Sequence, residues 1–271
     1  MTTAHLTFTH LSSRDNPRIK LFASLVSMPR ERRKCGQTLL DGTHLLGCAL
    51  DAGVELLDVC VSESGCVNPE ILALFARLPA DIPLICVPDT LFARLSPVDT
   101  PTGILTRIAL PLPAPQEEVV RETFVVLDGI QDPGNLGSIL RSAVAAGIRL
   151  AWLTSGCAQA WSPKALRAGM GAHFHLHIHE RTDALKELAA YQGKVVAAGV
   201  GEDSRMFFDA DLRGPVAWLF GAEGQGVSPA LLARADEILR IPMMEGIESL
   251  NVGAAVAVCL FEQMRQRVVM P

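Results

Sequence analysis

The chain has 271 residues, of which 49% are hydrophobic and 20% charged, and its formal net charge is −5. This length accommodates two domains of ordinary size, and the hydrophobic content excludes wholesale disorder. Aromatic residues make up only 5% of the chain. A nucleic-acid surface built on rows of stacking aromatic side chains is therefore disfavoured.

Neither a membrane segment nor a metal site is indicated by the sequence. No apolar run approaches the roughly 18 residues of a membrane span, and the first ten residues lack the basic region and apolar stretch of a signal peptide. The seven cysteines are odd in number and form no Cys-x-x-Cys pair, which argues against a disulfide framework or a zinc ribbon. We expect a reduced cytoplasmic protein.

Positive charge is concentrated at the N-terminus. Residues 1–50 carry seven Lys or Arg and three Asp or Glu, a balance of +4, whereas residues 111–271 carry fourteen and eighteen. An acidic total is unusual for a nucleic-acid binder, which is commonly basic. Any contact with nucleic acid is therefore expected mainly in the first 50 residues.

A linker is predicted over residues 111–121, because three prolines within five residues exclude regular structure. It divides the chain into residues 1–110 and 122–271. Helical and strand patterns alternate in the first part, which predicts a small α/β domain. The helices expected there are Asn16–Ser27, Thr43–Ala52 and Pro69–Leu78, and the strands are Thr38–Leu40, Leu56–Val61 and Pro83–Val87.

The alternation is sharper after the linker and predicts a mostly parallel sheet with helices on both faces. The expected strands are Phe124–Leu127, Leu150–Leu153, Val195–Ala198, Val216–Phe220 and Ile238–Ile241. The expected helices are Asn135–Ala146, Ser162–Ala168, Thr182–Ala190, Pro229–Ala235 and Ser249–Gln266, the last capped at or near Ser249.

Three segments that follow predicted strands carry clustered polar and glycine residues. They are Asp128–Arg141 (DGIQDPGNLGSILR), Leu219–Ser228 (LFGAEGQGVS) and Ile241–Ala254 (IPMMEGIESLNVGA). Turns at the carboxyl ends of parallel strands face the ligand crevice of an α/β sheet. Three glycines in six residues of the second segment let the backbone approach a ligand closely.

These segments, in this order, resemble the motif set of the SpoU-type (TrmH family) RNA ribose 2′-O-methyltransferases of the SPOUT superfamily. The shared patterns are D-P-x-N-x-G-x-I-x-R, G-x-E-G-x-G, and I-P-M followed by S-L-N. The resemblance implies a trefoil knot, S-adenosylmethionine as methyl donor, an RNA substrate and a homodimer whose interface uses the last helix. Periodicity alone indicates only an ordinary doubly wound sheet.

The resemblance also implies the site residues. It places Arg141, Asn135, Glu223, Ser249 and Asn251 in the catalytic set, and Gly221, Ile241, Met243, Leu250 and Asn251 around the cofactor. A guanidinium with a pKa above about 12 is a poor base. We therefore expect Arg141 to orient the phosphate and stabilise developing oxyanion charge. The hydroxyl proton would leave through Glu223, Ser249 or water, and the sequence leaves this choice open.

The first part of the chain resembles the small ribosomal-protein-like RNA-binding domain that precedes the catalytic domain in many rRNA-modifying members. The match lies in Ser13–Lys20 and in Leu39–Gly42, where Asp41 stands in place of the usual glutamate. Ribosomal RNA is thus favoured over tRNA. The expected RNA contacts are Arg14, Arg18, Lys20, Arg32, Arg33, Lys34 and, at the active site, Arg141.

Less specific interpretations exist for several of these residues. Asn135 is also a good helix N-cap, Glu223 suits a turn, Met243 suits a core, and Arg141 suits a helix surface. A nucleotide-dependent oxidoreductase is disfavoured because Pro133–Gly137 lacks the G-x-G-x-x-G fingerprint. A non-catalytic RNA-binding relative is disfavoured because the polar motif residues are retained together.

Four histidines alternate with apolar residues from His173 to His179. In a strand this spacing puts all four imidazoles on one face. No carboxylate or cysteine pattern completes a metal shell, so a solvated strand face is expected.

Overall fold

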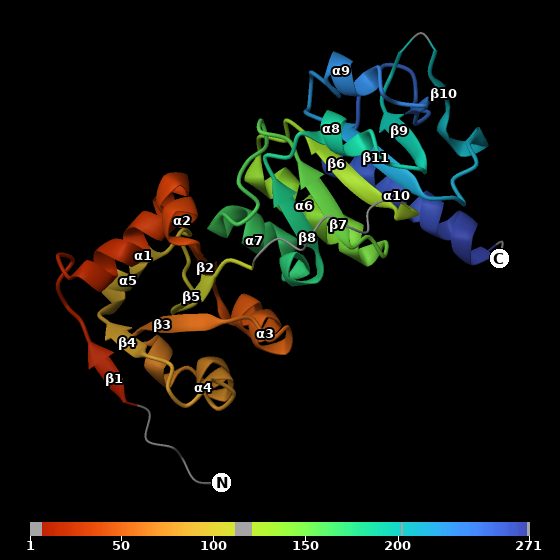
Figure 1. Ribbon diagram of the computed structural model, residues 1–271. Coiled ribbons are helices and arrows are strands. Elements are labelled where there is room, and N and C mark those ends of the chain that lie inside the picture. The colour runs from red at the N-terminus through yellow and green to blue at the C-terminus, as the bar shows by residue number, and fades with distance from the viewer. Residues whose placement is uncertain (1–6, 112–120, 202, 270–271) are drawn as a thin grey trace. The chain divides into compact units, whose positions relative to one another are not determined.

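The computed structural model describes residues 7–111, 121–201 and 203–269, and the chain divides into two compact units (Figure 1). Unit 1 comprises Met1–Leu112 with Trp161–Phe174, and unit 2 comprises Pro113–Ala160 with His175–Pro271. The predicted linker, residues 111–121, lies almost wholly outside the described residues. The predicted division into residues 1–110, 111–121 and 122–271 stays a prediction.

Unit 1 is built on a five-stranded mixed sheet in the order β1-β4-β3-β5-β2. Strand β3 pairs in parallel with β4, and β5 runs antiparallel to both β3 and β2. The strands are β1 Phe8–His10, β2 Gln37–Asp41, β3 Leu56–Ser62, β4 Leu84–Val87 and β5 Ile104–Ala109.

The helices of unit 1 bury apolar side chains against this sheet. Phe22 of α1 and Phe92 of α5 lie in one core cluster with Ile85 of β4 and Leu105 of β5. The helices are α1 Pro17–Ser27, α2 Pro29–Cys35, α3 Thr43–Asp51, α4 Pro69–Phe75, α5 Asp89–Leu95 and α7 Pro163–Gly169. Helix α7 joins this unit through β2, where Thr38 Oγ1 donates to the carbonyl of Trp161 at 2.6 Å.

Unit 2 contains a seven-stranded sheet in the order β10-β12-β9-β11-β6-β7-β8, and every pair described in it is parallel. The strands are β6 Phe124–Asp128, β7 Leu150–Leu153, β8 His177–Glu180, β9 Lys194–Ala198, β10 Arg205–Met206, β11 Val216–Gly221 and β12 Glu237–Arg240. The predicted mostly parallel α/β sheet is confirmed.

Alternate residues of the central strands face opposite layers, as strand geometry requires. Leu219 of β11 packs in a cluster with Leu188 and Leu231, whereas its neighbour Trp218 donates to Gln263 of the last helix. Helices therefore cover both faces. The helices of unit 2 are α6 Pro133–Ala145, α8 Ala184–Leu188, α9 Pro229–Leu232 and α10 Val252–Val269.

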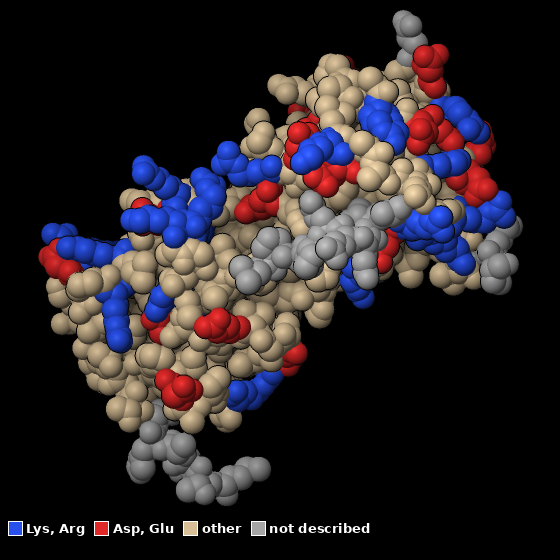
Figure 2. All heavy atoms as spheres, viewed as in Figure 1, with Lys and Arg blue, Asp and Glu red and all other residues tan. Residues whose placement is uncertain are grey.

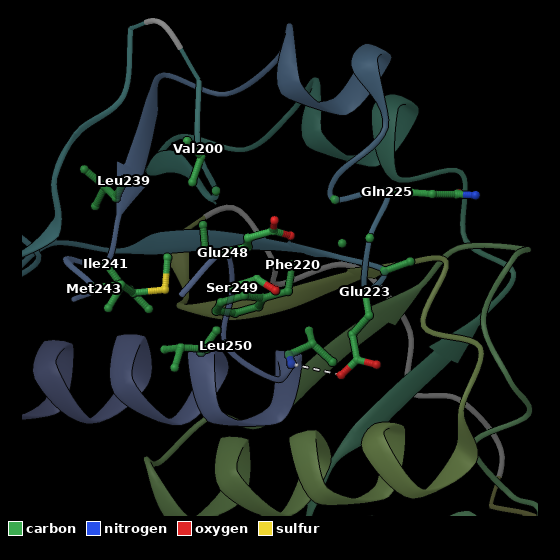
Figure 3. A pocket seen from close by; sticks show the side chains of 18 residues that line it. Val200, Phe220, Glu223, Gln225, Leu239, Ile241, Met243, Glu248, Ser249 and Leu250 are labelled. Atoms are coloured by element: carbon green, nitrogen blue, oxygen red, sulfur yellow. Dashed lines mark hydrogen bonds between the residues drawn. The ribbon is translucent and has the colours of Figure 1, made fainter. Parts of the chain in front are cut away.

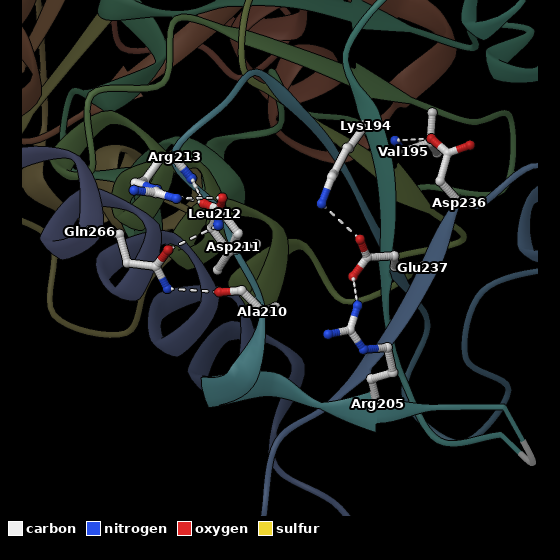
Figure 4. Close-up of polar contacts among 10 residues, drawn as sticks. All are labelled: Lys194, Val195, Arg205, Ala210, Asp211, Leu212, Arg213, Asp236, Glu237 and Gln266. Atoms are coloured by element: carbon white, nitrogen blue, oxygen red, sulfur yellow. Dashed lines mark hydrogen bonds and ion pairs between the residues drawn. The ribbon is translucent and has the colours of Figure 1, made fainter. Parts of the chain in front are cut away.

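Side-chain hydrogen bonds and ion pairs stabilise the edge strands of this sheet and the position of α10 (Figure 4). The Glu237 carboxylate accepts from Lys194 Nζ at 2.8 Å and from Arg205 Nη1 at 3.1 Å, which links β12 to its two neighbours. Gln266 of α10 accepts from the Leu212 amide at 2.9 Å and donates to the Ala210 carbonyl at 3.1 Å. The side-chain amide of Gln266 thus connects α10 to the segment that leads into β11.

The strands and helices expected from the sequence are present, with bounds that differ by up to a few residues. The strands β1, β5 and β10 and the helices α2 and α5 were not predicted. The expected start of the last helix at Ser249 is wrong, because α10 begins at Val252. None of the helices in the described part of the chain has the length and apolarity to cross a bilayer.

The predicted histidine strand is also wrong in its first half. His173 and His175 lie in a 3-10 helix, Ala172–His175, and β8 begins only at His177. His173 is buried, with its ring centroid 5.5 Å from that of Trp161. Packing against this tryptophan overrides the alternating pattern, so the four imidazoles do not share a face.

Candidate active site

A cavity of about 420 Å³ opens at the carboxyl ends of β9, β11 and β12 (Figure 3). These three strands are neighbours in the parallel sheet, so the segments that follow them converge at one edge, as expected for an α/β ligand crevice. The lining residues come from these segments and from the first turn of α10. They are Ala198–Val200, Phe220–Gly226, Leu239, Ile241, Met243, Glu248–Leu250, Val252 and Ala255.

The glycines of the second motif shape the wall of this cavity. A Cβ on Gly221 would lie 1.9 Å from the carbonyl carbon of Gly226, so only glycine fits there. Gly224 and Gly226 have φ angles of 84° and 68°, which other residues rarely adopt. The amide of Gly226 donates to the carbonyl of Ala222 at 2.8 Å and closes a tight turn.

Three residues from three different motifs meet beside the cavity. Glu223 Oε1 accepts from Asn251 Nδ2 at 2.6 Å, from Asn135 Nδ2 at 3.2 Å and from the Val252 amide at 3.3 Å. Asn251 Nδ2 also donates to Asn135 Oδ1 at 3.1 Å. Three of the five polar residues predicted to be catalytic thus form one hydrogen-bonded cluster, although they are separated by up to 116 positions along the chain. Arg141 and Ser249 make no described hydrogen bond to it.

The caps of the two helices at this site differ from those expected. Asn251, not Ser249, caps α10, because its Oδ1 accepts from the amides of Gly253 at 2.9 Å and Ala254 at 3.4 Å. Asp132 caps α6 by accepting from the Asn135 amide at 2.8 Å. The N-cap interpretation of Asn135 is therefore wrong, and its side chain is available to Glu223 and Asn251.

Arg141 is exposed on α6, six residues after Asn135. At 3.6 residues per turn, this spacing separates the two side chains by about 120° around the helix axis. Arg141 makes no hydrogen bond or ion pair with any residue the structure describes. Its guanidinium is free to contact an external group.

The cavity coincides with most of the positions expected to hold a cofactor. Gly221, Ile241, Met243 and Leu250 line it, together with Glu223 and Ser249, whereas Asn251 lies beside it in the polar cluster. Sequence analysis missed Ala198–Val200, Phe220, Leu239 and Glu248. The position of Ala198 at the carboxyl end of a predicted strand was a usable signal, since neighbouring parallel strands end at the same edge.

The basic residues expected to contact RNA lie mostly on the surface of α1 and α2, where Lys and Arg side chains gather (Figure 2). The prediction is wrong for Arg32. It is 3% exposed, and its Nη1 donates to the carbonyls of Leu25 and Val26 at the end of α1. This arginine joins two helices and does not face a ligand. The exposed members are Arg14, Arg18, Lys20, Arg33 and Lys34.

No metal centre was expected. Among the described residues, no three His, Cys, Asp or Glu side chains are grouped so that they could hold an ion.

Comparisons with known proteins agree with the family resemblance that the three motif segments indicate. Residues 122–261 match the model of the SpoU rRNA Methylase family, and residues 16–106 match that of an MRM3-like substrate binding domain. The chain is 33% identical to an uncharacterized tRNA/rRNA methyltransferase of Synechocystis, over 95% of this chain and 94% of that protein. It is 30% identical to the 23S rRNA (guanosine(2553)-2′-O)-methyltransferase of Bacillus subtilis, over 93% and 97%.

Among solved structures, the AdoMet-bound rRNA methyltransferase from Sinorhizobium meliloti is similar to this chain, with a TM-score of 0.83 and 26% identity. The superposition covers 96% of this chain and 98% of that one. The family match spans more than half of the chain and contains all three motif segments. This chain belongs to the SpoU rRNA methylase family.

Proposed function

We propose that this chain transfers a methyl group from S-adenosylmethionine to a ribose 2′-hydroxyl of ribosomal RNA. The observation that carries the proposal is the cluster of Asn135, Glu223 and Asn251, which joins all three motifs at the edge of one cavity. Family membership and the relatives named as rRNA 2′-O-methyltransferases support it. Nothing in them supports the alternative of an oxidoreductase.

The cavity fits S-adenosylmethionine in size and character. Its volume of about 420 Å³ lies within the range of roughly 300–1,000 Å³ typical of small-molecule sites. Apolar side chains of Phe220, Leu239 and Ile241 suit an adenine ring, and the Gly221–Gly226 turn offers backbone groups for its polar edges. When bound, the donor supplies an electrophilic methyl group on a positively charged sulfur.

In the proposed mechanism Arg141 holds the phosphate next to the reacting ribose. Its guanidinium is exposed and free of partners among the described residues. The planar guanidinium can donate two parallel hydrogen bonds to one phosphate group. Fixing the nucleotide in this way aligns the 2′-oxygen for attack, and such alignment can supply several kcal/mol. The positive charge also stabilises the oxygen as its proton leaves.

Glu223 is the proposed acceptor of that proton. Three donors fix its Oε1, while no described residue donates to Oε2. The carboxylate is thus held in a defined orientation with one oxygen open. Ser249 lines the same cavity, and its hydroxyl is the proposed relay for the proton between the substrate and Glu223.

The proposal includes the RNA-binding role of unit 1. Arg14, Arg18, Lys20, Arg33 and Lys34 are exposed and offer phosphate contacts that weaken as salt rises. The match of residues 16–106 to a substrate binding domain supports this role. A cytoplasmic location, where ribosomal RNA is modified, is part of the same proposal.

We propose a homodimer with α10 at its interface. Phe261, Met264 and Val268 are 46%, 40% and 68% exposed and follow helical spacing, so they form an apolar stripe. Cys259 of the same helix lies outside this stripe, because it is fully buried within its own subunit. Sedimentation should give a dimer, and the double substitution Phe261→Glu and Val268→Glu should give a monomer without methyl transfer.

The proposed knot is supported by the path of the chain. In the sheet, β9 lies between β11 and β12. After β12 the chain nevertheless returns across the sheet, and α10 packs against α6 and β11. There the Val252 amide reaches Glu223 in the loop after β11. Stretching the denatured chain from both ends should leave it shorter than an unknotted chain of 271 residues.

The deciding experiment for function is transfer of a tritiated methyl group to purified ribosomal RNA and, separately, to tRNA. Labelled nucleotides should resist alkaline cleavage, because a 2′-O-methyl group blocks the hydroxyl that attacks the phosphate. Label in tRNA alone would overturn the substrate assignment. Binding of the donor without any transfer would favour a non-catalytic relative, and binding of NAD in its place would overturn the reaction class.

A further inference from the structure

The charges around the cavity are of one sign. Among its described lining residues only Glu223 and Glu248 are charged, and no Lys or Arg contributes to the wall. The remaining surface is made of apolar side chains, glycine backbone, Gln225 and Ser249. A site with two carboxylates and no compensating cation attracts a positively charged ligand and disfavours an anionic one.

The two glutamates are not equivalent. Glu223 turns toward the start of α10, where its Oε1 accepts the Val252 amide (Figure 3). The same oxygen accepts from the side chains of Asn135 and Asn251. Glu248 makes no hydrogen bond or ion pair with any described residue, although its side chain lines the same cavity. No cation among the described residues pairs with its negative charge, which is therefore available to the occupant.

Methyl transfer changes the charge of the occupant. S-adenosylmethionine carries a sulfonium, and loss of the methyl group converts this sulfur to a neutral thioether in S-adenosylhomocysteine. The α-amino and carboxylate groups are the same in both molecules. A carboxylate near the sulfur therefore favours the donor over the product, whereas one near the α-amino group favours both equally.

We propose that Glu248 recognises the sulfonium charge, and that it makes the cavity prefer the methyl donor over the demethylated product. This inference rests on the proposed function and adds a residue that determines cofactor specificity. The effect is modest because Glu248 is exposed and solvent screens its charge. It favours release of the product after each turnover.

The test is equilibrium binding of three ligands to full-length protein by calorimetry, at low salt. The ligands are S-adenosylmethionine, S-adenosylhomocysteine and sinefungin, an analogue with a charged amine in place of the sulfonium. Glu248→Gln should lower the affinity for S-adenosylmethionine and for sinefungin by about two- to fivefold, the range of an exposed ion pair. The affinity for S-adenosylhomocysteine should stay unchanged within experimental error. The matched control is Glu245→Gln, which removes an exposed carboxylate of the same loop outside the cavity wall.

The outcomes separate this inference from the proposed function. Equal weakening of donor and product would place Glu248 at the α-amino group and overturn the inference, as would unchanged affinity for all three ligands. An equal effect of Glu245→Gln would overturn it too, because the preference would then come from the general field of the loop. Failure of the wild-type protein to bind the donor at all would instead count against the proposed function.

Discussion

Asn251 donates its side-chain amide to Glu223 Oε1 at 2.6 Å, while its own oxygen accepts the amide of Gly253 at 2.9 Å. One side chain thus caps α10 and fixes the carboxylate proposed to accept the proton. Because capping and orientation share one residue, the start of the helix and the geometry of the site depend on each other.

Asn251→Ala should lower both stability and methyl transfer. Loss of the cap should cost about 1 kcal/mol of the free energy of unfolding, and release of Glu223 should reduce the turnover number further. Asn68→Ala is the matched control, because Asn68 caps α4 in unit 1 by accepting from the amides of Glu70 and Ile71. Urea unfolding should show a similar loss for both variants, with activity lost only in the first. Equal activities would contradict the proposed link.

Arg141→Lys should reduce the maximal rate of methyl transfer by about a hundredfold, the cost of losing a positioned donor in a preorganised site. Lysine keeps the charge but cannot reproduce the two-point contact with a phosphate. Arg149→Lys changes another exposed arginine of unit 2 and should keep the wild-type rate. A near-wild-type maximal rate across the pH profile of Arg141→Lys would rule out the orienting role.

Gly221→Ala should abolish binding of the methyl donor, because the added Cβ would meet the Gly226 backbone at 1.9 Å and displace the turn that forms the cavity wall. Gly199→Ala offers the comparison, since Gly199 lines the same cavity but an added Cβ there meets nothing within 4 Å. Calorimetric titration of both variants measures the difference. Donor binding retained by Gly221→Ala would contradict the proposed role of this wall.

The strand and helix pattern was predictable because each element carries its own periodicity, as in the continuous apolar run of β6. Short edge strands such as β10, with two residues, contain too little pattern to detect. The start of α10 at Val252 follows from Asn251, whose Oδ1 accepts the amides of Gly253 and Ala254. Ser249, two residues earlier, is also a favoured capping residue, so local propensity did not choose between the two. The burial of Arg32 likewise depends on carbonyls at the end of α1.

The motif residues were predictable as a set, but their interactions were not. Sequence analysis named Asn135, Glu223 and Asn251 without indicating that one carboxylate oxygen serves both amides. Glu248 escaped notice because its role follows from the absence of other charges around the cavity wall that the structure describes, and that is a property of the folded surface.

His179 should make unit 2 less stable in mild acid. Burial lowers the pKa of His179 below its ordinary 6.5, the nearby His177 lowers it further, and Glu187 opposes the shift. The unfolded chain therefore binds the proton more readily, and stability is lost as the pH falls below about 6.5 toward the folded pKa. In wild type the urea midpoint of unfolding should fall between pH 7.5 and pH 5.5, and in His179→Asn this fall should be smaller. The exposed control His175→Asn should show the same fall as wild type. An unchanged pH dependence in His179→Asn would refute this.

Gln263→Leu should destabilise unit 2 by about 1–3 kcal/mol, the cost of a buried polar group left without a partner. Gln263 is 2% exposed; its Oε1 accepts from Trp218 Nε1 at 2.7 Å, and its Nε2 donates to the Leu212 carbonyl at 3.0 Å. Adding Trp218→Phe removes the orphaned indole donor, so the double variant should lose less stability than the sum of the two single changes. Urea unfolding of all four proteins gives this coupling, and strict additivity would show that the indole–amide bond contributes nothing to holding α10 against β11.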